Sequence, residues 1–114
     1  MGLRNVLDEL RALTHVSESL TLVGGGANSS FWRQVFADVY NIPVVHTRTG
    51  QQAAALGAAT IAGVGAGIWE DFEIIDKIFT IKESNQPDQK SAAVYEEIFI
   101  RYKKAAKILG EWVR

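Results

Sequence analysis

The sequence predicts a helix-rich α/β fold with two or so short strands. Three features support this prediction: apolar residues recur at helical spacing, two short β-branched runs interrupt them, and a glycine cluster, Gly24–Gly26, follows the first run. Two strands are too few for an ordinary α/β sheet. We therefore expect the 114-residue chain to be one domain at most and to form part of a larger sheet structure.

The first half of the chain is expected to alternate helices with strands. Helical spacing predicts an opening helix of about three turns through Leu3, Val6, Leu7, Leu10 and Leu13. Leu20–Val23 is typical of a short buried strand that stops at glycine. The next helix has one apolar face and begins at a capping residue, Asn28 or Ser29; that face holds Phe31, Val35, Phe36 and Val39. Pro43–His46 is the second strand, because proline is tolerated at a strand's first position.

The second half is expected to be mostly helical. The segment GQQAAALGAATIAGVGAG predicts a helix with a nearly flat face that ends at its last glycines, Gly65 and Gly67. Its small residues should pack closely against the glycine turn, nearest at Gly57 and Gly63. A loop with a short helix and a polar linker, ESNQPDQ, should follow. Apolar periodicity from Ser91 onward predicts a final helix of roughly six turns.

Composition excludes several functional classes. The net charge of −1 gives no electrostatic reason to expect nucleic acid or an anionic membrane as a partner. The chain has no cysteine, which excludes disulfides, thiolate metal sites and thiol catalysis. The opening segment is not a signal peptide, and the run of small apolar residues from Ala53 is too short and glycine-rich to span a bilayer. We expect a cytoplasmic protein.

The glycine turn is the main candidate for a binding site. Glycines let a ligand approach the backbone, and the free N–H groups and dipole of the following helix favour a phosphate. A tight strand-to-helix turn with no ligand explains the same residues, so spacing alone leaves both interpretations open. A Walker A loop is excluded because no lysine lies between Met1 and Asp76. A dinucleotide-binding fingerprint does not fit either, because no acidic residue follows the second strand.

Two segments in this order resemble the C-terminal domain of the FGGY carbohydrate kinases, in particular xylulokinases and gluconokinases. They are LTLVGGGANSSFWRQVFADVYNIPVV and QAAALGAATIAGVGAGIW, and the resemblance extends to the leading helix and the late YEEIFIRYKK helix. It implies a partial actin-like (ribonuclease H-like) ATPase domain, with residues 1–114 as its C-terminal part. The sugar-binding N-terminal domain would be absent, and the chain would be the last quarter or so of a kinase.

The resemblance also implies which residues meet the nucleotide. Gly24, Gly25, Gly26 and Ala27 would face the phosphates and ribose of ATP, and Asn28 and Ser29 would lie near the adenine. The reaction implied is transfer of the γ-phosphoryl of MgATP to a sugar hydroxyl, with xylulose or a related pentulose or sugar acid as the substrate.

The family's catalytic aspartate, sugar contacts and magnesium-associated acids belong to the preceding part of such a kinase, and none of those motifs occurs in this sequence. No catalytic or metal-ligating residue is therefore assigned. Asp38 is interpreted as structural or solvent-facing, and His15 and His46 as structural or surface residues. The chain alone should not phosphorylate a sugar.

Two alternatives remain. In the first, the chain is a truncated, non-catalytic interaction module whose apolar faces serve a homodimer or another partner. The second, a nucleotide sensor that is not a kinase, would require measurable ATP affinity from this chain alone, and we expect that affinity to be weak.

Overall fold

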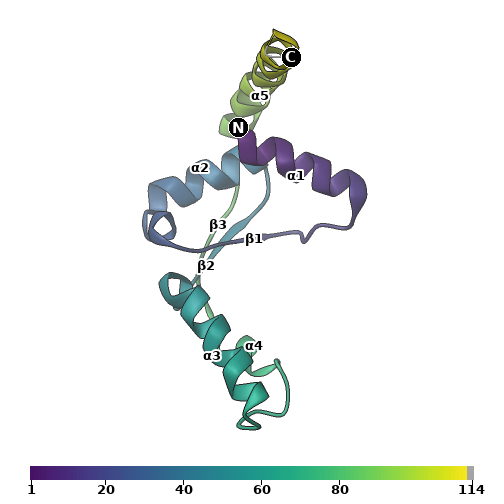
Figure 1. The fold of residues 1–114 in the computed structure, drawn as a ribbon. Coiled ribbons are helices and arrows are strands. Elements are labelled where there is room, and N and C mark those ends of the chain that lie inside the picture. The colour runs from purple at the N-terminus through teal and green to yellow at the C-terminus, as the bar shows by residue number, and fades with distance from the viewer. Residues whose placement is uncertain (113–114) are drawn as a thin grey trace.

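The computed structural model describes residues 1–112, and all of their side chains except those of Gln51, Glu111 and Trp112. In chain order the elements are α1 (Gly2–Leu13), β1 (Leu20–Leu22), the 3-10 helix η1 (Gly25–Asn28), α2 (Ser30–Tyr40), β2 (Val44–Thr47), the 3-10 helix η2 (Gly50–Gln52), α3 (Ala53–Gly65), α4 (Ile74–Ile78), β3 (Ile81–Asn85) and α5 (Gln89–Trp112). Helices α1 and α2 lie on one side of a small sheet, and α3 and α4 extend beyond one end of it (Figure 1).

The sheet has the order β1-β2-β3. Strand β1 runs parallel to β2, with Leu20 opposite Val44 and Leu22 opposite His46. Strand β3 is antiparallel to β2, and the register shifts between His46 and Thr47. The connection from β1 to β2 passes through α2, as a parallel pair requires.

The third strand corrects the sequence prediction, which placed a polar linker at residues 83–89. Strand β3 has no apolar alternation, and four of its five residues are exposed. It forms because its backbone pairs with β2, and this contribution leaves no pattern in the side chains. The predicted burial of the first strand is also wrong: Thr21 is exposed, and Val23 lies beyond the strand with 48% of its surface exposed.

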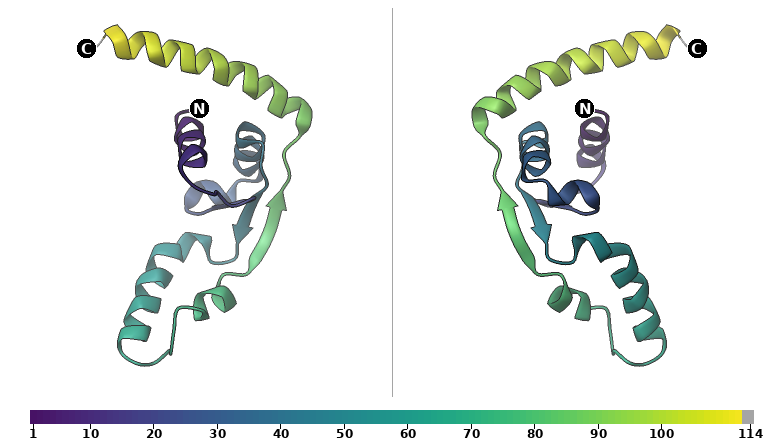
Figure 2. Two further views of the ribbon diagram at one scale, coloured as in Figure 1. Left: turned by 90° about the vertical axis from the view of Figure 1, so that its right-hand side faces the viewer. Right: turned by 90° about the vertical axis from the view of Figure 1, so that its left-hand side faces the viewer.

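The core lies between α2 and the sheet and continues where α5 packs on α2. Its fully or nearly buried apolar residues are Leu7, Ala27, Ala37, Val39, Tyr40, Val44, Ala92 and Phe99. The guanidinium of Arg4 lies 4.6 Å from the centre of the Phe99 ring and joins α1 to α5. Only the first half of α5 takes part, because residues 101–110 are exposed and that end projects away from the other helices (Figure 2).

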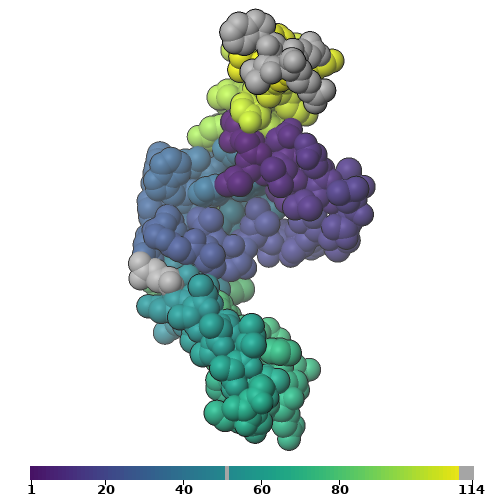
Figure 3. All heavy atoms as spheres, viewed as in Figure 1, coloured from purple at the N-terminus to yellow at the C-terminus, as the bar shows by residue number. Residues whose placement is uncertain are grey.

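Helices α3 and α4 form a narrow arm (Figure 3). The helix expected from the alanine and glycine run is present, and the chain turns away after it at Gly67, where φ is +72°. Its predicted packing against the glycine turn is wrong. A Cβ at Gly57 would meet nothing within 4 Å, whereas one at Gly63 would lie 2.4 Å from the Trp69 ring. The small residue at Gly63 therefore accommodates an indole on the arm itself.

No helix among residues 1–112 combines the length and the apolar character that a membrane crossing requires.

Candidate functional site

The glycine turn lies at the carboxyl end of β1. Gly24 has φ +84° and ψ −172°, a backbone region that only glycine populates readily. Its N–H donates to the Gly50 carbonyl oxygen at 3.2 Å, which ties the turn to the segment that follows β2. The first glycine is therefore required by the path of the chain itself.

The next two glycines have no such structural requirement. A Cβ at Gly25 or Gly26 would meet nothing within 4 Å, and neither residue has a positive φ. Both are exposed, and no described residue accepts a hydrogen bond from their N–H groups. They present open backbone with free donors at the start of η1, an arrangement suited to an anion such as phosphate.

Ala27 and Asn28, at the end of the turn, differ in exposure. The side chain of Ala27 is 1% exposed, so only its backbone could face a ligand. Its N–H donates to the Gly24 carbonyl oxygen at 3.1 Å, which closes the turn. Asn28 is exposed and is the free polar side chain at the end of η1.

Ser29 is the N-cap of α2, which resolves the choice that the sequence left between it and Asn28. Its Oγ accepts a hydrogen bond from the Trp32 N–H at 3.4 Å. Trp32 lies in the first turn of α2, beside the glycine turn as expected, and is 52% exposed.

Buried polar groups lie behind the turn at the end of β2. His46 and Thr47 are 6% and 4% exposed, and a Cβ at Gly50 would be 3.8 Å from the His46 ring and 3.4 Å from the Thr47 hydroxyl. Among the described residues, His46 Nδ1 and the hydroxyls of Thr47 and Thr49 have no hydrogen-bond partner. His46 is therefore a buried residue of the sheet rather than a surface one, and no sequence pattern marks this cluster beyond its position at the end of a strand.

Arg33 is the residue at this site that the sequence prediction missed. It is 4% exposed, and its Nη1 donates to the Ala27 carbonyl oxygen at 2.6 Å. Its Nε donates to Asn85 Oδ1 at 3.0 Å, and its Nη2 pairs with the Glu83 carboxylate. The available signal was weak: Arg33 lies one helical turn before Ala37, which is buried on the same side of α2.

Asp38 is structural, in agreement with the first of the two roles predicted for it. It is 6% exposed and accepts hydrogen bonds from Gln34 Nε2 at 2.8 Å and from the Asp88 N–H at 2.7 Å. Asp88 in turn accepts from the Ser91 N–H at 2.8 Å at the start of α5. Hydrogen bonding from the backbone and the side chain of Ser91 lowers the pKa of Asp88 below its ordinary value.

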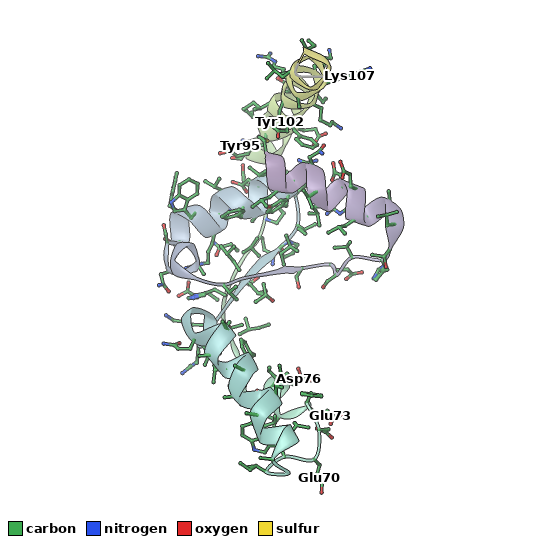
Figure 4. All side chains as sticks on the ribbon, viewed as in Figure 1. Glu70, Glu73, Asp76, Tyr95, Tyr102 and Lys107 are labelled. Atoms are coloured by element: carbon green, nitrogen blue, oxygen red, sulfur yellow. The ribbon has the colours of Figure 1, made fainter. Side chains whose placement is uncertain are left out.

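The described residues include no group of three or more His, Asp or Glu side chains placed to hold a metal ion. The acidic residues Glu70, Glu73 and Asp76 lie on the α3–α4 arm, away from the glycine turn (Figure 4). What the turn offers chemically is a pair of free backbone donors, which suit an anion.

Comparison with known proteins places this turn in a family context. The sequence profile for the C-terminal domain of the FGGY family of carbohydrate kinases matches residues 1–66, a range that includes the whole turn. An autoinducer-2 kinase from Salmonella choleraesuis is 36% identical over 93 residues, covering 80% of this chain and 17% of that protein. A xylulose kinase from Escherichia coli is 31% identical over 95 residues, covering 83% of this chain and 20% of that protein.

The fold agrees with these sequence matches. A solved structure described as a xyloylose kinase from Brucella ovis superposes with a TM-score of 0.81 at 28% identity, over 97% of this chain and 23% of that one. The structural neighbours have the actin-like (ribonuclease H-like) fold, which confirms the predicted fold class. The chain spans about a fifth of the length of the relatives it matches.

Proposed function

The chain belongs to the FGGY family of carbohydrate kinases, and on that premise we propose that residues 1–114 form the C-terminal part of the ATP-binding domain of a longer sugar kinase. In this proposal the preceding part of the kinase binds the sugar. The observation that best supports an ATP site is the open backbone at Gly25 and Gly26, with unobstructed N–H groups that the protein's own packing does not use.

The glycine turn fits the phosphates of ATP. The N–H groups of Gly25 and Gly26 would donate to phosphate oxygens, Gly24 would set the direction of the turn, and the buried Ala27 would contribute backbone only. Asn28 would face the ribose or adenine as the free polar side chain. Ser29 would position the first turn of α2 near the adenine through its capping bond.

The reaction proposed for the whole kinase is transfer of the γ-phosphoryl of MgATP to a sugar hydroxyl. Such a transfer depends on positioning, charge stabilisation and a carboxylate that accepts the hydroxyl proton. Within residues 1–112 the one buried aspartate, Asp38, is already hydrogen-bonded to Gln34 and Asp88. The described acids also do not form a magnesium site. We therefore assign the base and the metal ligands to the rest of the kinase and expect no sugar phosphorylation by this chain alone.

The names of the relatives support a small sugar or sugar acid as the acceptor. They include xylulose kinases and a gluconate kinase from Lactobacillus acidophilus. Xylulose, or a related pentulose or sugar acid, is accordingly the proposed substrate class, and the cytoplasm, where ATP and such metabolites occur, is the proposed location.

Titration of the chain with MgATP tests this function, with the amide chemical shifts recorded at each step. Shifts should be concentrated at residues 24–30 and should saturate, because the donors are at the start of η1. The arm residue Gly57 is an internal reference, since it lies in α3 with open space around it. Absence of saturable shifts at millimolar ATP, or shifts spread evenly over the arm, would count against a nucleotide site at the turn.

A second candidate, a self-association module, is favoured by the apolar surface of α1. Leu3, Val6, Leu10 and Leu13 on that helix are 66%, 52%, 46% and 83% exposed. Analytical ultracentrifugation distinguishes the two candidates. A dimer that Leu10→Glu disrupts, in a chain that does not bind ATP, would favour this role over nucleotide binding.

A further inference from the structure

We propose that Arg33 is a positioning residue that fixes the glycine turn to the edge of the sheet and so sets the direction of the Gly25 and Gly26 N–H groups. The predicted effect on ATP binding rests on the proposed nucleotide site, whereas the fixing of the turn by Arg33 rests on the structure alone.

The geometry of the guanidinium supports this role. Nη1 reaches the Ala27 carbonyl oxygen at 2.6 Å, inside η1 itself. On β3, Nε reaches Asn85 at 3.0 Å and Nη2 pairs with Glu83. The planar fork of an arginine can serve all three acceptors at once, whereas a lysine ammonium at the end of a flexible chain cannot reproduce that arrangement.

Strand β3 is a firm anchor because it is paired with the central strand. Asn85 lies opposite Val44 and Glu83 opposite His46, so both acceptors of Arg33 are held in the ladder of β2. The other end of the turn is tied to the same region by the hydrogen bond from Gly24 to Gly50. The two open glycines therefore lie between two attachments, one on each side.

The turn has little else to hold it. Its internal bonds are those of a single 3-10 turn, including Ala27 N–H to the Gly24 carbonyl at 3.1 Å and Ser29 N–H to the Gly26 carbonyl at 3.3 Å. Without the guanidinium the Ala27 carbonyl would lose its charged donor in a site where the arginine is almost fully buried. We infer that the turn would then sample other conformations and would bind phosphate less well, although Arg33 itself does not touch the ligand.

The chain supplies a matched control in Arg4. This arginine is also buried, at 8% exposed, and it also joins a carbonyl to a glutamate: Nη1 to the Val39 oxygen at 2.5 Å and Nη2 to Glu96 at 2.5 Å. Its bonds lie between α1, α2 and α5, away from the turn. A general loss of stability should therefore affect both arginine variants, and a positioning effect only one of them.

The experiment compares Arg33→Lys, Glu83→Gln and Arg4→Lys with the unaltered chain. Amide hydrogen exchange at residues 27–29, measured without nucleotide, should be about tenfold faster in Arg33→Lys, less so in Glu83→Gln, and unchanged relative to the rest of the chain in Arg4→Lys. The dissociation constant for MgATP should rise about tenfold in Arg33→Lys and clearly less in Arg4→Lys.

Equal exchange at the turn in Arg33→Lys and Arg4→Lys would overturn the positioning role. Faster exchange with an unchanged dissociation constant would overturn its functional part. If the unaltered chain does not bind MgATP at all, the proposed function fails, and the exchange comparison alone then decides whether Arg33 holds the turn. If Arg33→Lys does not fold, Glu83→Gln carries the test, because it keeps the arginine and removes only the charge of one partner.

Discussion

Replacement of Gly24 by alanine should destabilise the chain because of its backbone conformation. At φ +84° and ψ −172°, a residue with a Cβ occupies a region that costs about 1–3 kcal/mol. No steric contact adds to this cost, since a Cβ at Gly24 would meet nothing within 4 Å. Alanine also restricts the unfolded chain, and this effect stabilises the folded state by about 0.4–1 kcal/mol.

Gly25→Ala separates these two effects. It has the same effect on the unfolded chain, but Gly25 has neither a positive φ nor a neighbour within 4 Å. The difference in unfolding free energy between the two variants therefore isolates the backbone strain, and we expect Gly24→Ala to be less stable by about 1–3 kcal/mol. Urea unfolding followed by circular dichroism measures this difference, provided that the unfolding free energy of both variants depends equally steeply on urea concentration. If the two free energies agreed within about 0.5 kcal/mol, the assigned conformation of the turn would be refuted.

Two further predictions concern the arm and the start of α5. Gly63→Ala should cost about 1–3 kcal/mol, because the new methyl would lie 2.4 Å from the Trp69 ring, whereas Gly57→Ala in the same helix should stabilise by about 0.5–1 kcal/mol. Thermal or urea unfolding of the pair checks this, and similar stabilities for the two variants would contradict the packing of Trp69. The lowered pKa of Asp88 means that its contribution to stability is fully present above its ordinary pKa of 3.8 and is lost as the pH falls through the lowered value. Asp88→Asn keeps an acceptor for the Ser91 N–H but does not titrate. Below about pH 4 the unfolding free energy of this variant should therefore fall less with pH than that of the unaltered chain. If the two unfolding free energies fell in parallel with pH, the Asp88 carboxylate would not contribute to stability.

The sequence predicted those elements that depend on local pattern. Apolar periodicity correctly placed α1 and α2 as helices, and Ser29 was correctly included among the possible caps. It did not predict which faces are buried, because Leu7 is the one buried apolar residue of α1 and Phe31 on α2 is exposed. The fold class followed from the family resemblance, and the structural neighbours confirm it. The assignment of Gly24–Ser29 to ATP remains a prediction.

The features missed by the sequence prediction depend on tertiary contacts. Strand β3 owes its existence to pairing with β2, and no period of two marks its residues. The role of Arg33 requires knowing that Glu83 and Asn85, about fifty residues later in the chain, lie beside it. Gly63 could not be assigned to Trp69 because the loop between them has no regular period.

The most direct test of the central claim compares MgATP binding by the unaltered chain, Gly25→Val and Gly57→Val. Both glycines have open space around a Cβ, so both variants should fold, but only the first places a branched side chain where a phosphate would approach. Saturable binding at residues 24–30 that is lost in Gly25→Val and retained in Gly57→Val is the predicted result. Equal affinity in all three chains would show that the glycine turn is only a turn.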